Sequence, residues 1–120
     1  GPLDRLQEYF QFLERELHAE APFAGCLYGV IAQTLAGREP QVRQALARSF
    51  HAWEESLAAL LASAQRVGEI APEADIPDLV ASIVEAYEGA LIRMKAADDP
   101  AVFARFRSRR LPELLGLAPD

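Results

Sequence analysis

The chain of 120 residues has one cysteine, so it cannot close a disulfide within itself. No apolar run approaches the roughly 20 residues that a membrane-spanning helix needs. A basic start followed by an apolar stretch, which would indicate a signal peptide, is also missing. We therefore expect a cytoplasmic protein that does not contact the membrane.

Basic residues are in the minority. The chain has 12 Lys and Arg residues against 18 Asp and Glu residues, which gives a formal net charge of -6. A field of this sign repels the phosphate backbone of nucleic acids. The chain alone is therefore not expected to bind DNA. Four arginines, Arg105, Arg107, Arg109 and Arg110, form one basic cluster. A solvated helix face is the favoured interpretation of it, with a DNA-backbone contact as the minor alternative.

Motifs for catalysis and metal binding are missing as well. Neither His18 nor His51 has a glutamate three residues before it, which excludes the paired Glu-x-x-His pattern of a di-iron bundle. One cysteine and two scattered histidines supply too few ligands for zinc. The sequence contains no phosphate loop, no nucleotide fingerprint and no Gly-x-Ser-x-Gly elbow. We expect no enzyme activity, no cofactor and no metal.

Apolar residues recur at three- and four-residue steps along most of the chain, which predicts amphipathic helices. The predicted helices cover residues 3–19, 25–37, 40–67, 76–96 and a last segment that begins after Asp99. The pattern indicates an all-α fold, a five-helix antiparallel bundle, in which residues 3–117 form one domain. Gly1 and Pro2 resemble the remnant of a removed affinity tag, and residues 118–120 are expected to be a short tail.

Local signals predict where several helices begin and end. Asp75, with Asp78 three residues later, is a candidate N-cap for the helix over 76–96. Gly68 is expected to end the preceding helix in a left-handed conformation. Pro112 is expected to kink or end the last helix, because its ring removes a backbone donor and crowds the preceding turn.

The segment 25–37 carries no charged side chain, which predicts a helix that is apolar on every side and lies in the middle of the bundle. Cys26, near its start, has two interpretations. It is either a small buried apolar residue or a thiol that reacts with electrophiles or oxidants, favoured by a cation such as Lys95 nearby.

Aromatic residues at helical spacing on three helices also have two interpretations. They either fill the core or line a ligand cavity that has a few placed polar groups. The cavity interpretation assigns ligand contacts to Tyr9, Phe10, Leu13, Cys26, Gly29, Val30, Gln33, Phe50, Trp53, Glu54, Leu57, Tyr87 and Leu91.

The helix over 76–96 has two apolar stripes. The first, which includes Val84 and Tyr87, can serve the core. The second needs cover from the last helix or from another copy of the protein. If a second copy supplies that cover, the dimer interface consists of Leu79, Ile83, Ala86, Ala90, Val102 and Phe106.

Five short motifs resemble one known family. They are Gly25-Cys26-Leu27-x-Gly29, Val42-Arg43, Phe50-x-x-Trp53, Ala64-Gln65-x-x-Gly68-Glu69-Ile70 and Glu88-Gly89-Ala90-Leu91-x-x-x-Lys95-Ala96. Together they resemble the C-terminal regulatory domain of TetR-type transcriptional repressors, over residues 3–117.

This resemblance implies an effector-binding domain that forms homodimers through its last two long helices. It implies that operator DNA is bound only through an N-terminal helix-turn-helix module that this chain lacks. The effector would be a small apolar or electrophilic molecule, and Cys26 and Lys95 match positions through which some members respond to electrophiles. Two other functions stay open: a stand-alone helical interaction domain without a cavity, and, less favoured, a cysteine-dependent enzyme.

The reactive-thiol interpretation predicts that methyl vinyl ketone adds once to the chain, because Cys26 is the only cysteine. Intact-mass spectrometry after mild treatment should show a single adduct that Cys26→Ser abolishes, while the circular dichroism spectrum stays unchanged. A chain that remains unmodified unless it is denatured would instead identify Cys26 as a packed residue.

Overall fold

The computed structural model describes residues 1–19 and 38–117. The helices of this part are α1 (Pro2–Ala19), α3 (Pro40–Arg66), α4 (Ile76–Ala97), and a C-terminal unit made of α5 (Ala101–Arg105), the π-helix η1 (Phe106–Arg110) and α6 (Leu111–Leu114). Because no strand occurs in the described ranges, the all-α prediction is confirmed there. The five-helix count is not confirmed: the described part has four helical units, and the expected helix over 25–37 lies outside it.

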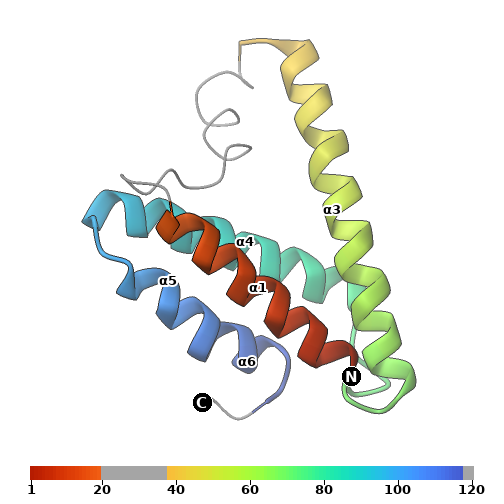
Figure 1. The fold of residues 1–120 in the computed structure, drawn as a ribbon. Helices are drawn as coiled ribbons and strands as arrows, with labels where there is room; N and C mark the ends of the chain where they lie inside the picture. Colours follow the sequence, from red (N-terminus) through yellow and green to blue (C-terminus); the bar gives the residue numbers. More distant parts are fainter. Residues whose placement is uncertain (20–37, 118–120) are drawn as a thin grey trace.

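The helices form a bundle in which α1 crosses in front of α4 and runs beside the C-terminal unit (Figure 1). Helix α3 stands at a steep angle to α1 and α4, and its N-terminal half extends beyond them (Figure 1). Of its buried residues, Leu57, Leu61 and Ala64 lie in the C-terminal half and belong to the main core. No helix in the described ranges has the length and apolar character needed to cross a membrane.

The predicted boundary signals of α3 and α4 are confirmed. The carboxylate of Asp75 accepts a hydrogen bond of 3.2 Å from the backbone N–H of Asp78 and so caps α4. Gly68 has φ +85°, in the left-handed region that favours glycine, and directs the chain away from α3. The loop between the two helices is held by the side-chain amide of Gln65, which donates to backbone carbonyls of that loop.

The last helix does not end at Pro112. It continues to Leu114, and the distortion lies one turn earlier, where residues Phe106–Arg110 form the π-helix η1. In an α-helix a proline clashes with the carbonyl four residues before it and leaves that carbonyl without a donor. A wider π turn directly before Pro112 changes this register, so the chain stays helical past the proline.

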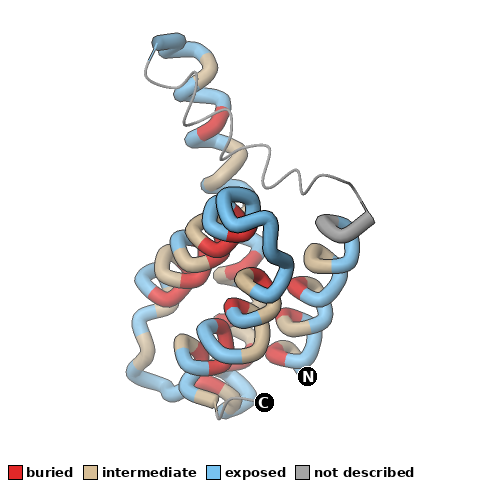
Figure 2. The backbone as a smooth tube through the Cα atoms, turned by 90° about the vertical axis from the view of Figure 1, so that its left-hand side faces the viewer, coloured by how far each residue is buried: buried red, intermediate tan, exposed pale blue. Residues whose placement is uncertain are grey.

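The core lies where the inner faces of all four helical units meet (Figure 2). Tyr87 of α4 stands at its centre, with only 6 % of its surface exposed. Its ring centroid lies 5.6 Å from that of Phe10 in α1, 5.6 Å from Phe103 in α5, and 6.0 Å from Phe106 in η1. Such tilted and edge-to-face aromatic pairs add to the free energy of area burial.

Helix α1 is fixed near both ends by polar contacts to distant parts of the chain. The backbone N–H of Leu3 donates to the Glu69 carboxylate at 3.2 Å. Towards the other end, Arg107 Nε donates to Glu14 Oε1 at 3.1 Å, and both side chains are largely shielded from water. Between these contacts, Leu6 and Phe10 are fully buried. The position of α1 is therefore well defined relative to both α3 and the C-terminal unit.

The second apolar stripe of α4 is covered in large part by the chain's own C-terminal unit. Ile83 is 0 % exposed and Phe106 is 3 % exposed within a single chain. Ala86 and Val102 are partly exposed. Ala86 of α4 and Val102 of α5 therefore remain partly open to a second copy, whereas Leu79, Ile83, Ala90 and Phe106 are buried within their own chain.

Candidate functional site

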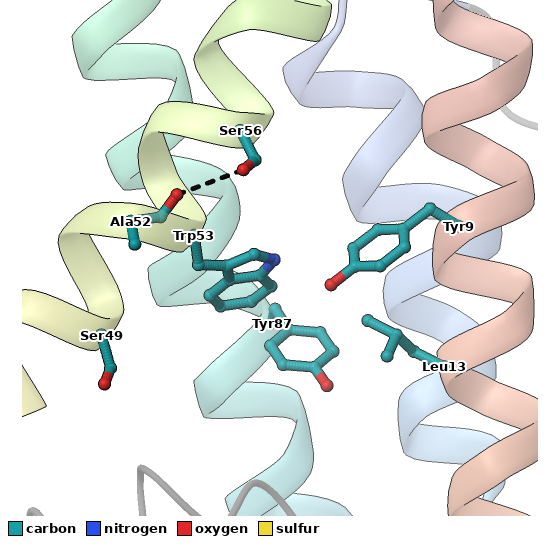
Figure 3. Close-up of a pocket in the computed structure, with 7 residues that line it drawn as sticks. All are labelled: Tyr9, Leu13, Ser49, Ala52, Trp53, Ser56 and Tyr87. Carbon is teal, nitrogen blue, oxygen red and sulfur yellow. Dashed lines mark hydrogen bonds between the residues drawn. The ribbon is translucent and has the colours of Figure 1, made fainter.

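A hollow of about 540 Å³ lies between α1, α3 and α4. It is lined by Tyr9 and Leu13 of α1, by Ser49, Ala52, Trp53 and Ser56 of α3, and by Tyr87 of α4 (Figure 3). We call it the α1–α3–α4 pocket. Clefts of this size lined mainly by apolar and aromatic groups are the usual form of small-molecule sites.

Helix α3 supplies the pocket with one continuous face. Ser49 lies three residues before Ala52 and four before Trp53, and Ser56 lies four and three residues after them, which places both serines on the same side of the helix as this pair. The Ser56 hydroxyl donates to the backbone carbonyl of Ala52 at 3.2 Å. Because Ser49, Ala52 and Ser56 are small, the turns on either side of Trp53 leave space in front of its indole ring.

The aromatic side chains connect the pocket to the core. The Trp53 and Tyr87 ring centroids lie 5.3 Å apart at an interplanar angle of 68°, an edge-to-face contact. Tyr9 makes a similar contact with Phe10, at 5.3 Å and 66°. Tyr87 therefore belongs to both regions: it lines the pocket and contacts the buried rings behind it.

The part of the lining formed by described residues carries hydrogen-bonding groups but no charge. Two tyrosine hydroxyls, two serine hydroxyls and the Trp53 indole N–H are its polar groups. The indole Nε1 atom is buried and has no hydrogen-bond partner among the described residues. Within those residues, no three His, Cys, Asp or Glu side chains lie close enough together to hold a metal ion. The described lining suits the binding of a neutral molecule better than acid-base chemistry.

The structure brings four of the predicted ligand contacts to this pocket: Tyr9, Leu13, Trp53 and Tyr87. Phe10, Leu57 and Leu91 lie instead in the buried core.

Other predicted contacts lie elsewhere. Phe50 packs against the core, and Glu54 is partly exposed on α3 without lining the pocket. Lys95 is exposed on α4. The remaining predicted contacts, Cys26, Gly29, Val30 and Gln33, lie outside the described residues.

Sequence analysis missed Ser49, Ala52 and Ser56 as pocket residues. The signal that could have found them is their spacing: Ser49 and Ser56 lie one turn before and one turn after Trp53, and Ala52 lies one turn from each serine. Small residues at such positions are easily overlooked, because their short side chains contribute to a cavity only by leaving space unfilled.

A second, smaller hollow of about 190 Å³ lies between α4 and the C-terminal unit. Its lining combines small or apolar residues with arginines: Ala86, Gly89, Ala90, Arg93, Val102, Arg105, Phe106 and Arg110. Four of the residues predicted for a dimer interface, Ala86, Ala90, Val102 and Phe106, therefore lie together here. Leu79 and Ile83 do not line this groove, which we call the α4–α5 groove.

Comparison with known proteins gives a family match over most of the chain. Residues 2–109 match the family described as "Tetracyclin repressor-like, C-terminal domain". The chain belongs to this family. The resemblance to TetR-type regulators that the sequence motifs indicated is thereby confirmed.

Two characterised regulators are similar to this tetracyclin repressor-like domain. The HTH-type transcriptional repressor DhaR of Mycobacterium sp. (strain GP1) is 32% identical over 95 residues, which are 78% of this chain and 46% of DhaR. The transcriptional regulator AcuR of Cereibacter sphaeroides is 29% identical over 95 residues, 79% of this chain and 43% of AcuR. The chain thus spans less than half the length of these relatives, both of which are named as transcriptional regulators. No solved structure matches it.

The placement of Trp53 at a pocket wall predicts that truncating it costs little stability. Phe10 is 0 % exposed, so Phe10→Ala should lower the free energy of unfolding by about 3 to 5 kcal/mol, the usual cost for a core aromatic residue. Trp53→Ala should cost well under half as much, because its removal enlarges a hollow that already exists. Urea denaturation followed by far-UV circular dichroism measures both, and equal losses would contradict the pocket.

Proposed function

We propose that this chain is the ligand-sensing and dimerising regulatory domain of a TetR-type transcriptional regulator. The observation that carries the proposal is the α1–α3–α4 pocket, in which three aromatic residues and two serines from three helices surround a hollow of about 540 Å³. Family membership supports a regulatory role, and the geometry supports a small, largely apolar ligand.

Helix α1 is the element through which a ligand would act on the rest of a regulator. It contributes Tyr9 and Leu13 to the pocket. Since the matched family is a C-terminal domain and the relatives are more than twice as long as the matched segment, their further residues lie mainly before α1. In an intact regulator, a DNA-binding module would precede α1, and operator DNA would be bound only there.

A ligand shifts such a system only through its different affinity for the two arrangements of the protein. A molecule that fills the pocket pushes on α1 on one side and on Trp53 and Tyr87 on the other. The arrangement of α1 that best fits the bound molecule becomes more populated, and the spacing of DNA-binding modules in a dimer changes with it.

The rival interpretation is a stand-alone interaction domain with a fully packed core. The hollow beside Trp53 favours the sensor, because a helical domain that serves only as a scaffold gains stability by filling such space.

Ligand binding can be tested with Trp53 itself, which is the only tryptophan in the chain. We expect toluene to change the intensity and position of the Trp53 fluorescence emission in a saturable way, because it would enter the pocket beside the indole ring. Ala52→Phe should fill the pocket and abolish the change. Ala59→Phe, at an exposed position of α3 outside the pocket, is the matched control and should retain it. A linear, non-saturable response in all three proteins would contradict the proposal.

Dimerisation is proposed to use the α4–α5 groove, where small residues allow close approach of a second copy. Gly89 has no atom within 4 Å of the position its Cβ would occupy, and Ala86 and Val102 beside it are partly exposed. Ile92, on the same helix, is 45% exposed and adds apolar surface. Two copies that pack here would each cover the second stripe of α4.

Sedimentation velocity at micromolar concentration should show a dimer for the natural sequence. Ala86→Arg should shift the protein to monomer, since it places a long charged side chain beside Arg93 and Arg105 in the groove. Ala59→Arg introduces the same charge on an exposed face of α3 and should leave the dimer intact. A monomeric natural chain, or equal effects of both variants, would count against this interface.

A further inference from the structure

We infer that the ligand of the α1–α3–α4 pocket is an uncharged molecule with an apolar body and a carbonyl or ether oxygen that accepts a hydrogen bond from Nε1 of Trp53. This inference rests on the proposed function and names the chemical class of the ligand. It depends on three observations: an unsatisfied donor, an uncharged lining, and the position of the donor relative to the pocket.

The donor is the indole N–H of Trp53. An indole nitrogen can donate one hydrogen bond and accept none. Nε1 is shielded from water, yet no acceptor among the described residues lies within hydrogen-bonding distance of it. Buried tryptophan N–H groups usually find a partner, because a lost hydrogen bond to water is otherwise uncompensated. An acceptor oxygen brought by a ligand would supply that partner.

The direction of this donor fits a ligand between α3 and α1. Figure 3 shows the indole nitrogen directed towards Tyr9, and the Tyr9 hydroxyl directed back towards α3. Both side chains line the pocket, so a ligand oxygen near Nε1 would also lie on the side of the Tyr9 hydroxyl. The rest of the ligand would lie against Leu13 and the rings of Trp53 and Tyr87.

The charge of the surroundings selects a neutral ligand. No ionisable Asp, Glu, Lys, Arg or His side chain lines the pocket among the described residues. Glu8 and Glu14 adjoin Tyr9 and Leu13 along α1, but neither lines the pocket. Glu14 Oε1 accepts from Arg107 Nε at 3.1 Å, and its Oε2 is buried without a partner among the described residues. A carboxylate ligand would therefore lose its hydration without gaining a cation.

Three small molecules of similar shape test separately whether the ligand needs a hydrogen-bond acceptor and whether it must be uncharged. Acetophenone carries a carbonyl acceptor, isopropylbenzene replaces that oxygen with a methyl group, and benzoate replaces the methyl ketone with an anion. Dissociation constants are measured by titration of backbone amide NMR signals. Each is measured on the natural chain and on Trp53→3-benzothienylalanine, in which sulfur replaces the indole N–H with little change in shape. Because the chain has one tryptophan, the analogue enters at position 53 alone.

When the N–H is removed, we expect the affinity for acetophenone to fall about 5- to 10-fold relative to the affinity for isopropylbenzene. A loss of this size corresponds to the free energy of one hydrogen bond. The ratio of the dissociation constants of acetophenone and isopropylbenzene is compared between the two proteins. The difference in hydrophobicity between the two ligands is the same in both proteins and therefore cancels. Benzoate should bind the natural chain at least about 10-fold more weakly than acetophenone, because its charge is buried without a partner.

A second measurement needs no variant. The natural chain has a single indole N–H signal in its NMR spectrum, and that proton should move downfield on binding acetophenone but not on binding isopropylbenzene. An unchanged affinity ratio in the benzothienyl protein, with both ligands bound, would overturn the role of Trp53 and leave the proposed sensor intact. Tight binding of benzoate would overturn the neutral-ligand requirement. If none of the three molecules bound, both the inference and the proposed ligand pocket would fail.

Discussion

The packing of aromatic rings around Tyr87 is the constraint on which the rest of the structure depends. This one side chain of α4 lies within 5.3 to 6.0 Å, centroid to centroid, of rings from α1, α3, α5 and η1. Every described helix except the short α6 therefore meets at Tyr87. Edge-to-face and tilted contacts have preferred angles, so they fix the rotation of each helix as well as its distance. The pocket wall on the Trp53 side is consequently as well defined as the core behind it.

The pocket and the core are thus two sides of one aromatic cluster. A ligand beside Trp53 and Tyr87 touches residues whose other faces contact the core, so its effect is not confined to the surface. Close-packed interiors deform little without repacking, and a small displacement at Tyr87 has to be accommodated by α1 or by the C-terminal unit. This arrangement is well suited to a sensing domain, because the binding site and the packing that positions α1 share their central residue.

Much of the fold could be predicted from the sequence because its signals are local. Asp75 and Gly68 mark helix ends through interactions within a few residues of each. The candidate site was only partly predictable. Phe10 and Tyr9 are neighbours on α1, yet Phe10 lies in the core and Tyr9 lines the pocket. Which of the two faces the pocket depends on how α1 packs against α3, and the sequence does not show this. The small residues around Trp53 carry no hydrophobic signal. The π-helix before Pro112 was also missed, because a proline alone does not show whether a helix stops or widens.

The two polar contacts of α1 bear on the order in which the chain folds. Leu3 bonds to a residue 66 positions later, and Glu14 to one 93 positions later. During synthesis, α1 leaves the ribosome before the other described helices but cannot complete its packing until the C-terminal unit exists. Until then its apolar face lacks part of its final cover, because Phe10 contacts Phe106 of η1 as well as Tyr87 of α4. Contacts of such long sequence separation slow folding, because the loop between them must close before they form. The first helix of this domain is therefore among the last to be secured.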